Sequence, residues 1–192
     1  LRGLDRLQAV IVAGPARQHP LLIMKNRLIP VLLVLLPLLP PGVRADASPA
    51  SVMRRVFEWQ VAHPWSASHP VTSNDGTRGW VQGAFLTGVM EAWRATGDTA
   101  YLDYAKDIAE KNGWKLGPRA RHADDEIAGQ TYLELNALDP APEKIADTKR
   151  VLDAIVAAPG SGHELWWWCD ALYMAPPTFV KLSQATHDPR YA

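Results

Sequence analysis

Hydrophobic residues recur at intervals of three and four positions through most of the chain beyond about residue 50. This spacing places them on one face of an α-helix, whereas no segment alternates between apolar and polar residues for long enough to predict a strand. The pattern therefore predicts an all-α protein. The predicted helices span about residues 51–62, 80–95, 99–112, 124–137, 142–157 and 176–186.

The ends of these helices carry local signals. The proline after His63 ends the first helix, because the residue before a proline avoids helical dihedral angles. Asp98 or Thr99 can cap the third helix. Pro176 and Pro177 fit only in the first turn of the last helix. Residues 170–175 can therefore form a separate helical turn, an alternative that the sequence leaves open.

The turns between helices repeat. The segment Ala95–Tyr101 resembles the segment Ala185–Tyr191, and Asp139 occupies the same slot between them. Asp98, Asp139 and Asp188 stand 41 and 49 residues apart. Periods of this length are typical of stacked helical hairpins, which form either an open solenoid or a closed toroid.

The longer loops are expected at the opposite end of this stack. Residues 65–79, 114–123 and 161–165 precede the first helix of each hairpin and contain three histidines, three arginines and two tryptophans: His69, His122, His163, Arg78, Arg119, Arg121, Trp65 and Trp114. Unusual chemistry gathered at one end of a repeat indicates a concave site there.

The N-terminal region has the three parts of a signal peptide. A basic start at Met24–Arg27 is followed by an apolar run from Leu28 to Pro40 and a small-residue cleavage site that ends at Ala45. The apolar run is shorter than the ~20 residues that a spanning helix needs. We expect residues 24–45 to be removed, leaving a secreted or periplasmic protein with no membrane attachment, and residues 1–23 to be upstream translated sequence.

Composition excludes several classes of function. The chain has 20 Lys and Arg against 20 Asp and Glu, so its charge does not favour nucleic acid or an anionic membrane as partner. The single cysteine, Cys169, excludes an internal disulfide. The six histidines are scattered without a pair at helical spacing, and no phosphate-binding glycine loop occurs. We therefore expect no metal and no cofactor.

The most distinctive stretch is Trp166–Pro177, in which three consecutive tryptophans run into Asp170 at the start of a predicted helix. Flat aromatic faces beside an acid suit a sugar ring and its leaving group. The alternative is a core tryptophan cluster in which Asp170 serves only as a helix N-cap.

Four segments together carry a family resemblance: Trp80–Gly83, the turn Ala95–Tyr101, Ala123–Leu135 and Trp166–Pro177. They resemble glycoside hydrolase family 105, the unsaturated rhamnogalacturonyl hydrolases of pectin degradation, which are related to the unsaturated glucuronyl hydrolases of family 88. The resemblance covers about residues 51–192. It implies an (α/α)6 barrel of six hairpins, of which residues 46–192 would form the N-terminal part, about half.

The resemblance also implies the reaction. Pectin lyases leave a sugar with a C4=C5 double bond, which these enzymes hydrate instead of displacing the leaving group directly. Asp170 matches the catalytic acid and base, and flanking Trp rings are expected to desolvate it and raise its pKa. Asp124 matches a second active-site aspartate that binds substrate. Asp125 is the alternative in this register, and one of the two is expected to cap a helix.

Other candidates at the predicted site have an equally plain structural interpretation. Stacking on sugar or binding of its hydroxyl groups is assigned to Trp80, Gln82, Trp166 and Trp168, each of which fits a core position as well. His122 and His163 lie in loops at the mouth, where His163 could contact the substrate carboxylate. Arg119 and Arg121 could do the same, although exposed arginines are common.

The expected partner is thus an unsaturated uronyl oligosaccharide. Two alternatives remain, an unsaturated glucuronyl hydrolase acting on glycosaminoglycan fragments and a helical-repeat protein that binds sugars or a partner without catalysis. A partial toroid would expose apolar helix faces, which favours association or poor solubility. The sequence does not predict a defined oligomeric state.

Overall fold

The computed structural model describes residues 48–64, 76–160 and 165–192. The predicted upstream segment, the predicted signal peptide, His163 and most of the loop 65–79 lie outside the described residues. Helices make up all the regular structure in these three ranges, as the hydrophobic spacing predicts. They are α2 Pro49–Ala62, η2 Gly76–Arg78, α3 Trp80–Thr96, α4 Thr99–Lys111, α5 Ala123–Glu126, α6 Ala128–Leu138, α7 Pro142–Ala157, α8 Ala171–Met174, α9 Pro176–Thr186 and η3 Pro189–Tyr191.

Two differences from the predicted elements concern the site described below. The single helix predicted over 124–137 is two helices, α5 and α6, that meet at Ile127. The open question about residues 170–175 is resolved by α8, a separate four-residue helix, and the two prolines occupy the first turn of α9. Both short helices therefore sit immediately before a longer one.

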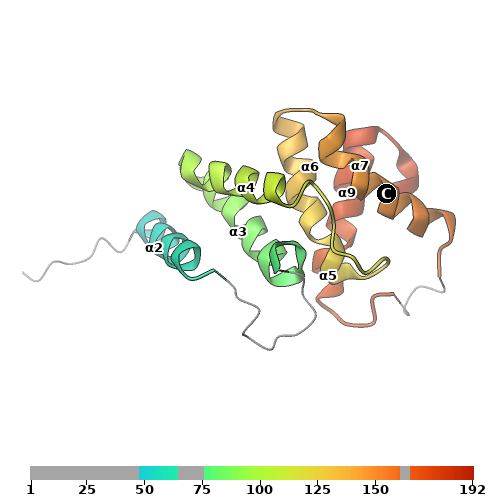
Figure 1. The fold of residues 1–192 in the computed structure, drawn as a ribbon, viewed down its shortest axis with the longest axis horizontal. Helices are drawn as coiled ribbons and strands as arrows, with labels where there is room; N and C mark the ends of the chain where they lie inside the picture. The colour runs from blue at the N-terminus through green and yellow to red at the C-terminus, as the bar shows by residue number, and fades with distance from the viewer. Residues whose placement is uncertain (1–47, 65–75, 161–164) are drawn as a thin grey trace, which may run out of the picture. The chain divides into compact units, whose positions relative to one another are not determined.

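Helix α6 is central to the packing of the helices (Figure 1). Helix α6 lies between α3 and α9, while α4 packs against α3 and α6, and α7 packs against α6 and α9. Glu134 of α6 pairs with Arg94 of α3 at 2.8 Å and with Lys181 of α9 at 2.9 Å, and it thereby joins the three helices. This is the stack of helical hairpins that the repeat predicts.

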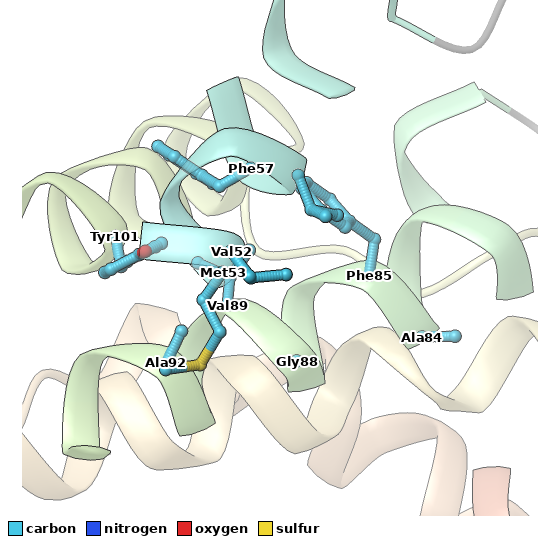
Figure 2. Close-up of a pocket in the computed structure, with 10 residues that line it drawn as sticks. Val52, Met53, Phe57, Ala84, Phe85, Gly88, Val89, Ala92 and Tyr101 are labelled. Atoms are coloured by element: carbon cyan, nitrogen blue, oxygen red, sulfur yellow. The ribbon is translucent and has the colours of Figure 1, made fainter. Parts of the chain in front are cut away.

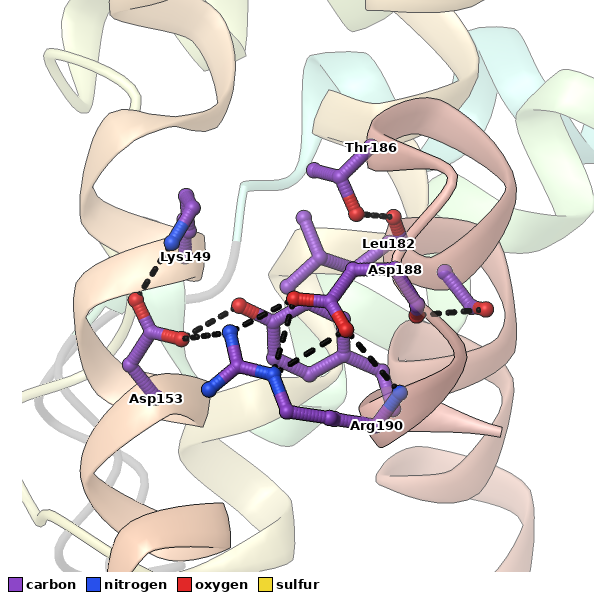
Figure 3. A network of polar contacts seen from close by, with 8 residues as sticks. Lys149, Asp153, Leu182, Thr186, Asp188 and Arg190 are labelled. Atoms are coloured by element: carbon purple, nitrogen blue, oxygen red, sulfur yellow. Dashed lines mark hydrogen bonds and ion pairs between the residues drawn. The ribbon is translucent and has the colours of Figure 1, made fainter.

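The repeated turns have matching geometry. Gly97 and His187 both adopt left-handed dihedral angles, with φ of 70° and 56°. Asp98 then accepts the N–H of Ala100 at 3.0 Å, and Asp188 accepts the N–H of Arg190 at the same distance. Figure 3 shows the surroundings of the second turn. Asp153 of the neighbouring helix α7 accepts hydrogen bonds from Lys149 at 2.5 Å and from the buried Tyr191, which follows the turn.

Asp139 does not form this turn, which corrects the predicted equivalence. Its backbone is extended at the end of α6, and its carboxylate pairs with Lys144 at 2.7 Å. Asn136 instead accepts the N–H of Ala141 at 3.1 Å, just before Pro142 begins α7. The sequence spacing of Asp139 is therefore similar to that of the other two aspartates, but its role is different.

Helix α2 contributes one buried side chain to the core, that of Phe57. The Phe57 ring lies 4.7 Å from the Tyr101 ring and 5.4 Å from the Tyr104 ring, measured between centroids. Beside it, an apolar pocket of about 320 Å³ opens between α2 and α3 (Figure 2). No carboxylate, imidazole or cation lines this pocket. It offers no groups for acid or base chemistry.

Helix α2 also carries exposed apolar side chains, among them Val56 at 59% and Trp59 at 60% exposure. In the described ranges, no helix combines the length and the apolar character that crossing a bilayer requires.

Candidate active site

Three segments distant in sequence meet around α5 and α8. Helix α5 packs on α8 and on α3. A small buried cluster joins them, and Trp80, Ala84, Trp166 and Trp168 pack against it. Its buried members are Ala123, Ile127, Ala171, Met174 and Ala175. Small side chains on both short helices permit this close approach.

Two further residues explain why the segments fit together. A Cβ atom on Gly83 of α3 would lie 2.3 Å from Cγ2 of Ile127, so the absence of a side chain allows α3 to approach this point. The amide of Gln130 donates to the carbonyl oxygens of Tyr173 at 2.8 Å and Met174 at 3.0 Å. Gln130 thereby satisfies carbonyl groups at the end of α8, where the helix itself leaves them without intrahelical partners.

Asp125 is an internal member of the site. Its side chain is 1% exposed, and its Oδ2 atom accepts from Arg119 Nε at 2.6 Å. A Cβ atom on Gly117 would lie 2.0 Å from the Asp125 Oδ1 atom, so the carboxylate packs directly on the loop backbone. The N–H of Gly117 also donates to the carbonyl oxygen of Asp125 at 3.0 Å. These contacts attach the loop 117–122 to α5.

Asp124 lies closer to solvent, with 16% of its side chain exposed. Its Oδ2 atom is 3.4 Å from Arg119 Nη2 and 3.7 Å from His122 Nδ1. Arg119 Nη1 lies 3.2 Å from His122 Nε2, and it can donate there only if Nε2 carries no proton. The His122 Nδ1 atom faces Asp124 and forms no hydrogen bond within the described ranges.

The three tryptophans have three different environments. Trp166 is half-buried, and its ring meets that of Phe179 at 5.8 Å. Trp168 is half-buried, and its ring lies 5.0 Å from the His122 ring, so it joins the Asp124 side of the site. Trp167 is 78% exposed and meets the Trp168 ring at 5.4 Å. Sequence reasoning selected the first and third and missed the most accessible indole.

Asp170 immediately precedes α8, beside α5. Its side chain is exposed, so the expectation that flanking Trp rings shield it from water is wrong. The rings instead face His122 and Phe179. Asp170 occupies the N-cap position of α8, but its side chain makes no capping hydrogen bond, and no other bond to it is found within the described ranges. Its carboxylate is therefore open to a ligand.

Comparison with known proteins assigns the chain to a family. The sequence pattern of Glycosyl Hydrolase Family 88 matches residues 52–192. The chain belongs to this family. The predicted relationship to glycoside hydrolase families 105 and 88 is confirmed by this match.

Relatives of this family 88 chain are longer. An unsaturated 3S-rhamnoglycuronyl hydrolase of Formosa agariphila is 34% identical over 152 residues, which cover 72% of this chain and 38% of that protein. The solved structure of a polysaccharide lyase is 31% identical and superposes with a TM-score of 0.60. This match covers 74% of this chain and 42% of the lyase chain. A family 88 protein from Bacteroides vulgatus is 26% identical with a TM-score of 0.58, and the match covers 74% of this chain and 44% of that one. The chain thus spans less than half the length of these proteins, whose family 88 members have an α/α toroid fold.

Not every predicted site residue joins this cluster of the family 88 chain. Gln82 is buried, and its amide donates to the Tyr104 hydroxyl of α4 at 3.2 Å. Arg119, which sequence reasoning set aside, contacts both aspartates and His122. Neither Asp124 nor Asp125 caps a helix, because His122 holds the N-cap position of α5.

Glu126 is a further acid that the sequence reasoning missed. It is 1% exposed, and burial raises its pKa to about 7, with the charge of Asp125 acting in the same direction and that of Arg121 against it. Acids in the first turn of a helix are commonly explained by their interaction with the helix dipole. The sequence therefore offered no reason to expect that Glu126 is buried.

The described part of the chain contains no group of three His, Cys, Asp or Glu side chains placed to hold a metal ion.

Proposed function

We propose that this family 88 protein acts as a glycosidase that removes Δ4,5-unsaturated uronyl residues from oligosaccharides by hydration of their double bond. One observation carries the proposal. The short helix that bears Asp124 packs on the short helix that follows Asp170, and the His122 and Trp168 rings meet between these segments. Carboxyl groups, an indole face and a guanidinium group thus lie at one place.

In the proposed reaction, Asp170 in its neutral form adds its proton to C4 of the double bond. The resulting carboxylate removes a proton from a water molecule as the water oxygen bonds to C5, which restores the acid. The hemiketal then opens and releases the next sugar. An ordinary glycosidase needs two carboxyl groups flanking the bond, whereas this route uses one carboxyl group twice.

The other residues would bind and orient the sugar. Asp124 accepts from a ring hydroxyl group, with Arg119 paired to its carboxylate and His122 beside it. Trp168 and Trp167 present indole faces on which a sugar ring can stack. A ring stacked there would exclude water from Asp170, and this favours the neutral acid that the first step needs.

For the substrate, we propose an unsaturated uronyl residue linked to rhamnose. The motif resemblance favours fragments of rhamnogalacturonan, and the name of the Formosa agariphila relative favours unsaturated 3S-rhamnoglycuronyl saccharides. Rhamnose beside the unsaturated sugar is common to both names.

The test is the absorbance of the conjugated alkene and carboxylate. Incubation with lyase-treated rhamnogalacturonan should remove this absorbance, and Asp170→Asn should abolish the loss while calorimetry still detects binding. An Asp170→Asn variant with full turnover would refute the mechanism. Loss of absorbance only with glycosaminoglycan fragments would indicate a glucuronyl hydrolase. An increase in absorbance with uncut polymer would indicate a lyase, and binding without turnover a non-catalytic module.

We also propose export, with cleavage of the leader after Ala45. N-terminal sequencing of protein recovered outside the cytoplasm should begin at Asp46. Protein that retains residues 24–45 would contradict this assignment.

A further inference from the structure

The carboxyl group of Glu126 is buried without a partner. Its side chain is 1% exposed, and neither Oε1 nor Oε2 has a hydrogen-bond partner in the part of the chain that the structure describes. Other low-exposure acids of this protein are paired, as Asp125 is with Arg119 and Glu134 is with Arg94 and Lys181. An ionised carboxylate in such a place is strongly unfavourable, so an unpaired buried carboxyl group is normally neutral.

The charged groups around Glu126 do not compensate for its burial. Asp125 on the same helix repels a negative charge there, and Arg121 in the preceding loop attracts one without forming a hydrogen bond or ion pair with it. Helix α5 packs against α3, α6 and α8. The charged residues of those helices are Glu91 and Arg94 on α3 and Glu134 on α6, with Asp170 before α8. Helix α9, which contacts Glu126 through Thr178, adds Lys181. No ion pair joins any of these five residues to Glu126 within the described ranges.

Glu126 is also attached to the structure that positions the site. Its carbonyl oxygen accepts from the Thr178 hydroxyl of α9 at 3.0 Å. The residues on either side of it are Asp125, which holds Arg119, and Ile127, which packs against Gly83. A displacement of Glu126 would therefore be passed to the Asp124–Asp125 segment.

We propose that Glu126 is a positioning residue controlled by its own protonation. In its neutral form the side chain holds α5 in place. On ionisation it turns toward Arg121 and solvent, which loosens the Asp124–Asp125 segment. Its importance for substrate rests on the proposed function. The linkage between proton and fold does not, because it depends only on the buried carboxyl group and its neighbours.

The direction of the pH effect follows from the pKa of Glu126, which burial raises from 4.5 to about 7. The folded protein keeps the proton that the unfolded chain releases, so the contribution to stability is complete below pH 4.5 and is lost as pH rises through 7. This difference in pKa corresponds to a fall in the folding equilibrium constant on the order of 100-fold.

The experiment compares urea unfolding of the wild-type chain and Glu126→Gln from pH 4 to 8. The folding equilibrium constant of Glu126→Gln divided by that of wild type should increase on the order of 100-fold between pH 4.5 and 8. The matched control is Glu134→Gln, which removes a paired acid and should destabilise the protein at pH 8. A ratio for Glu126→Gln that does not change with pH would overturn the proposal.

Two measurements do not depend on that ratio. Carbon NMR of glutamate-labelled wild-type protein should show one side-chain carboxyl group titrating near pH 7, and titration of every Glu near 4.5 would refute a neutral Glu126. Hydrogen exchange, corrected for intrinsic rates, should accelerate at the Gly117 and Asp125 amides between pH 6 and 8 in wild type but not in Glu126→Gln. Equal behaviour of the two proteins would overturn the positioning role. Neither measurement uses a saccharide, so failure of the proposed function would be seen separately.

Discussion

Replacement of Gly117 by alanine tests how the loop 117–122 holds Asp125. The added Cβ atom would lie 2.0 Å from Oδ1 of Asp125 and 2.5 Å from its Cβ and Cγ atoms. Non-bonded atoms cannot approach this closely, and the Asp125 side chain is enclosed, with 1% of it exposed. Either the loop or the carboxylate must move, and movement of either one strains the 2.6 Å contact with Arg119.

The size of the effect follows from two contributions. Overpacking of a well-packed site costs about 1–3 kcal/mol, and complete loss of a partner from a buried pair costs about 3–5 kcal/mol. Arg119 remains 32% exposed, so the pair is strained rather than left without solvation. We therefore expect Gly117→Ala to lower the free energy of unfolding by about 3 kcal/mol. At this chain length, that corresponds to about 6–12 °C in Tm.

Differential scanning calorimetry measures the change directly. The matched control is Gly88→Ala on α3, where an added Cβ atom has no neighbour within 4 Å. Because glycine is unfavourable inside a helix, this control should raise stability by about 0.5–1 kcal/mol. Equal melting temperatures for Gly117→Ala and wild type would refute the packing argument, as would an equal loss in both variants.

Three further predictions concern other regions. His187 adopts a left-handed φ of 56° where the equivalent turn has Gly97, so His187→Gly should stabilise by up to about 1 kcal/mol in urea unfolding, and a loss would contradict the proposed turn equivalence. Trp167→Ala should leave the free energy of unfolding within about 0.5 kcal/mol of wild type, since the indole is 78% exposed, but should weaken oligosaccharide binding by calorimetry. Unchanged affinity would remove Trp167 from the site. The exposed apolar face of α2 should promote association, so Trp59→Ser should reduce the concentration-dependent mass in sedimentation, whereas Glu91→Gln on α3 should not.

Local signals made the helices predictable from the sequence. Asp98 caps α4, Gly97 ends α3 in a left-handed conformation, and Pro176 begins α9, each through contacts within a few residues. The break at Ile127 was not predictable from such signals, because the apolar and acidic pattern continues across it.

Which side chain faces which neighbour was decided by the tertiary structure. Asp124 and Asp125 are adjacent acids in one predicted helical turn, yet only Asp125 is enclosed, by Gly117 and Arg119. Likewise, Trp166 is half-buried because it packs against Phe179 of α9 and the small buried cluster, whereas Trp167 is 78% exposed.

The sequence by itself determined an all-α chain of hairpins and its family, because helix periodicity, capping and sequence motifs depend on near neighbours. The tertiary structure alone decided that Asp170 is open to solvent, that Gln82 faces Tyr104 and that Glu126 is buried without a partner. Burial depends on segments that arrive from distant parts of the chain, so it cannot be read from local spacing.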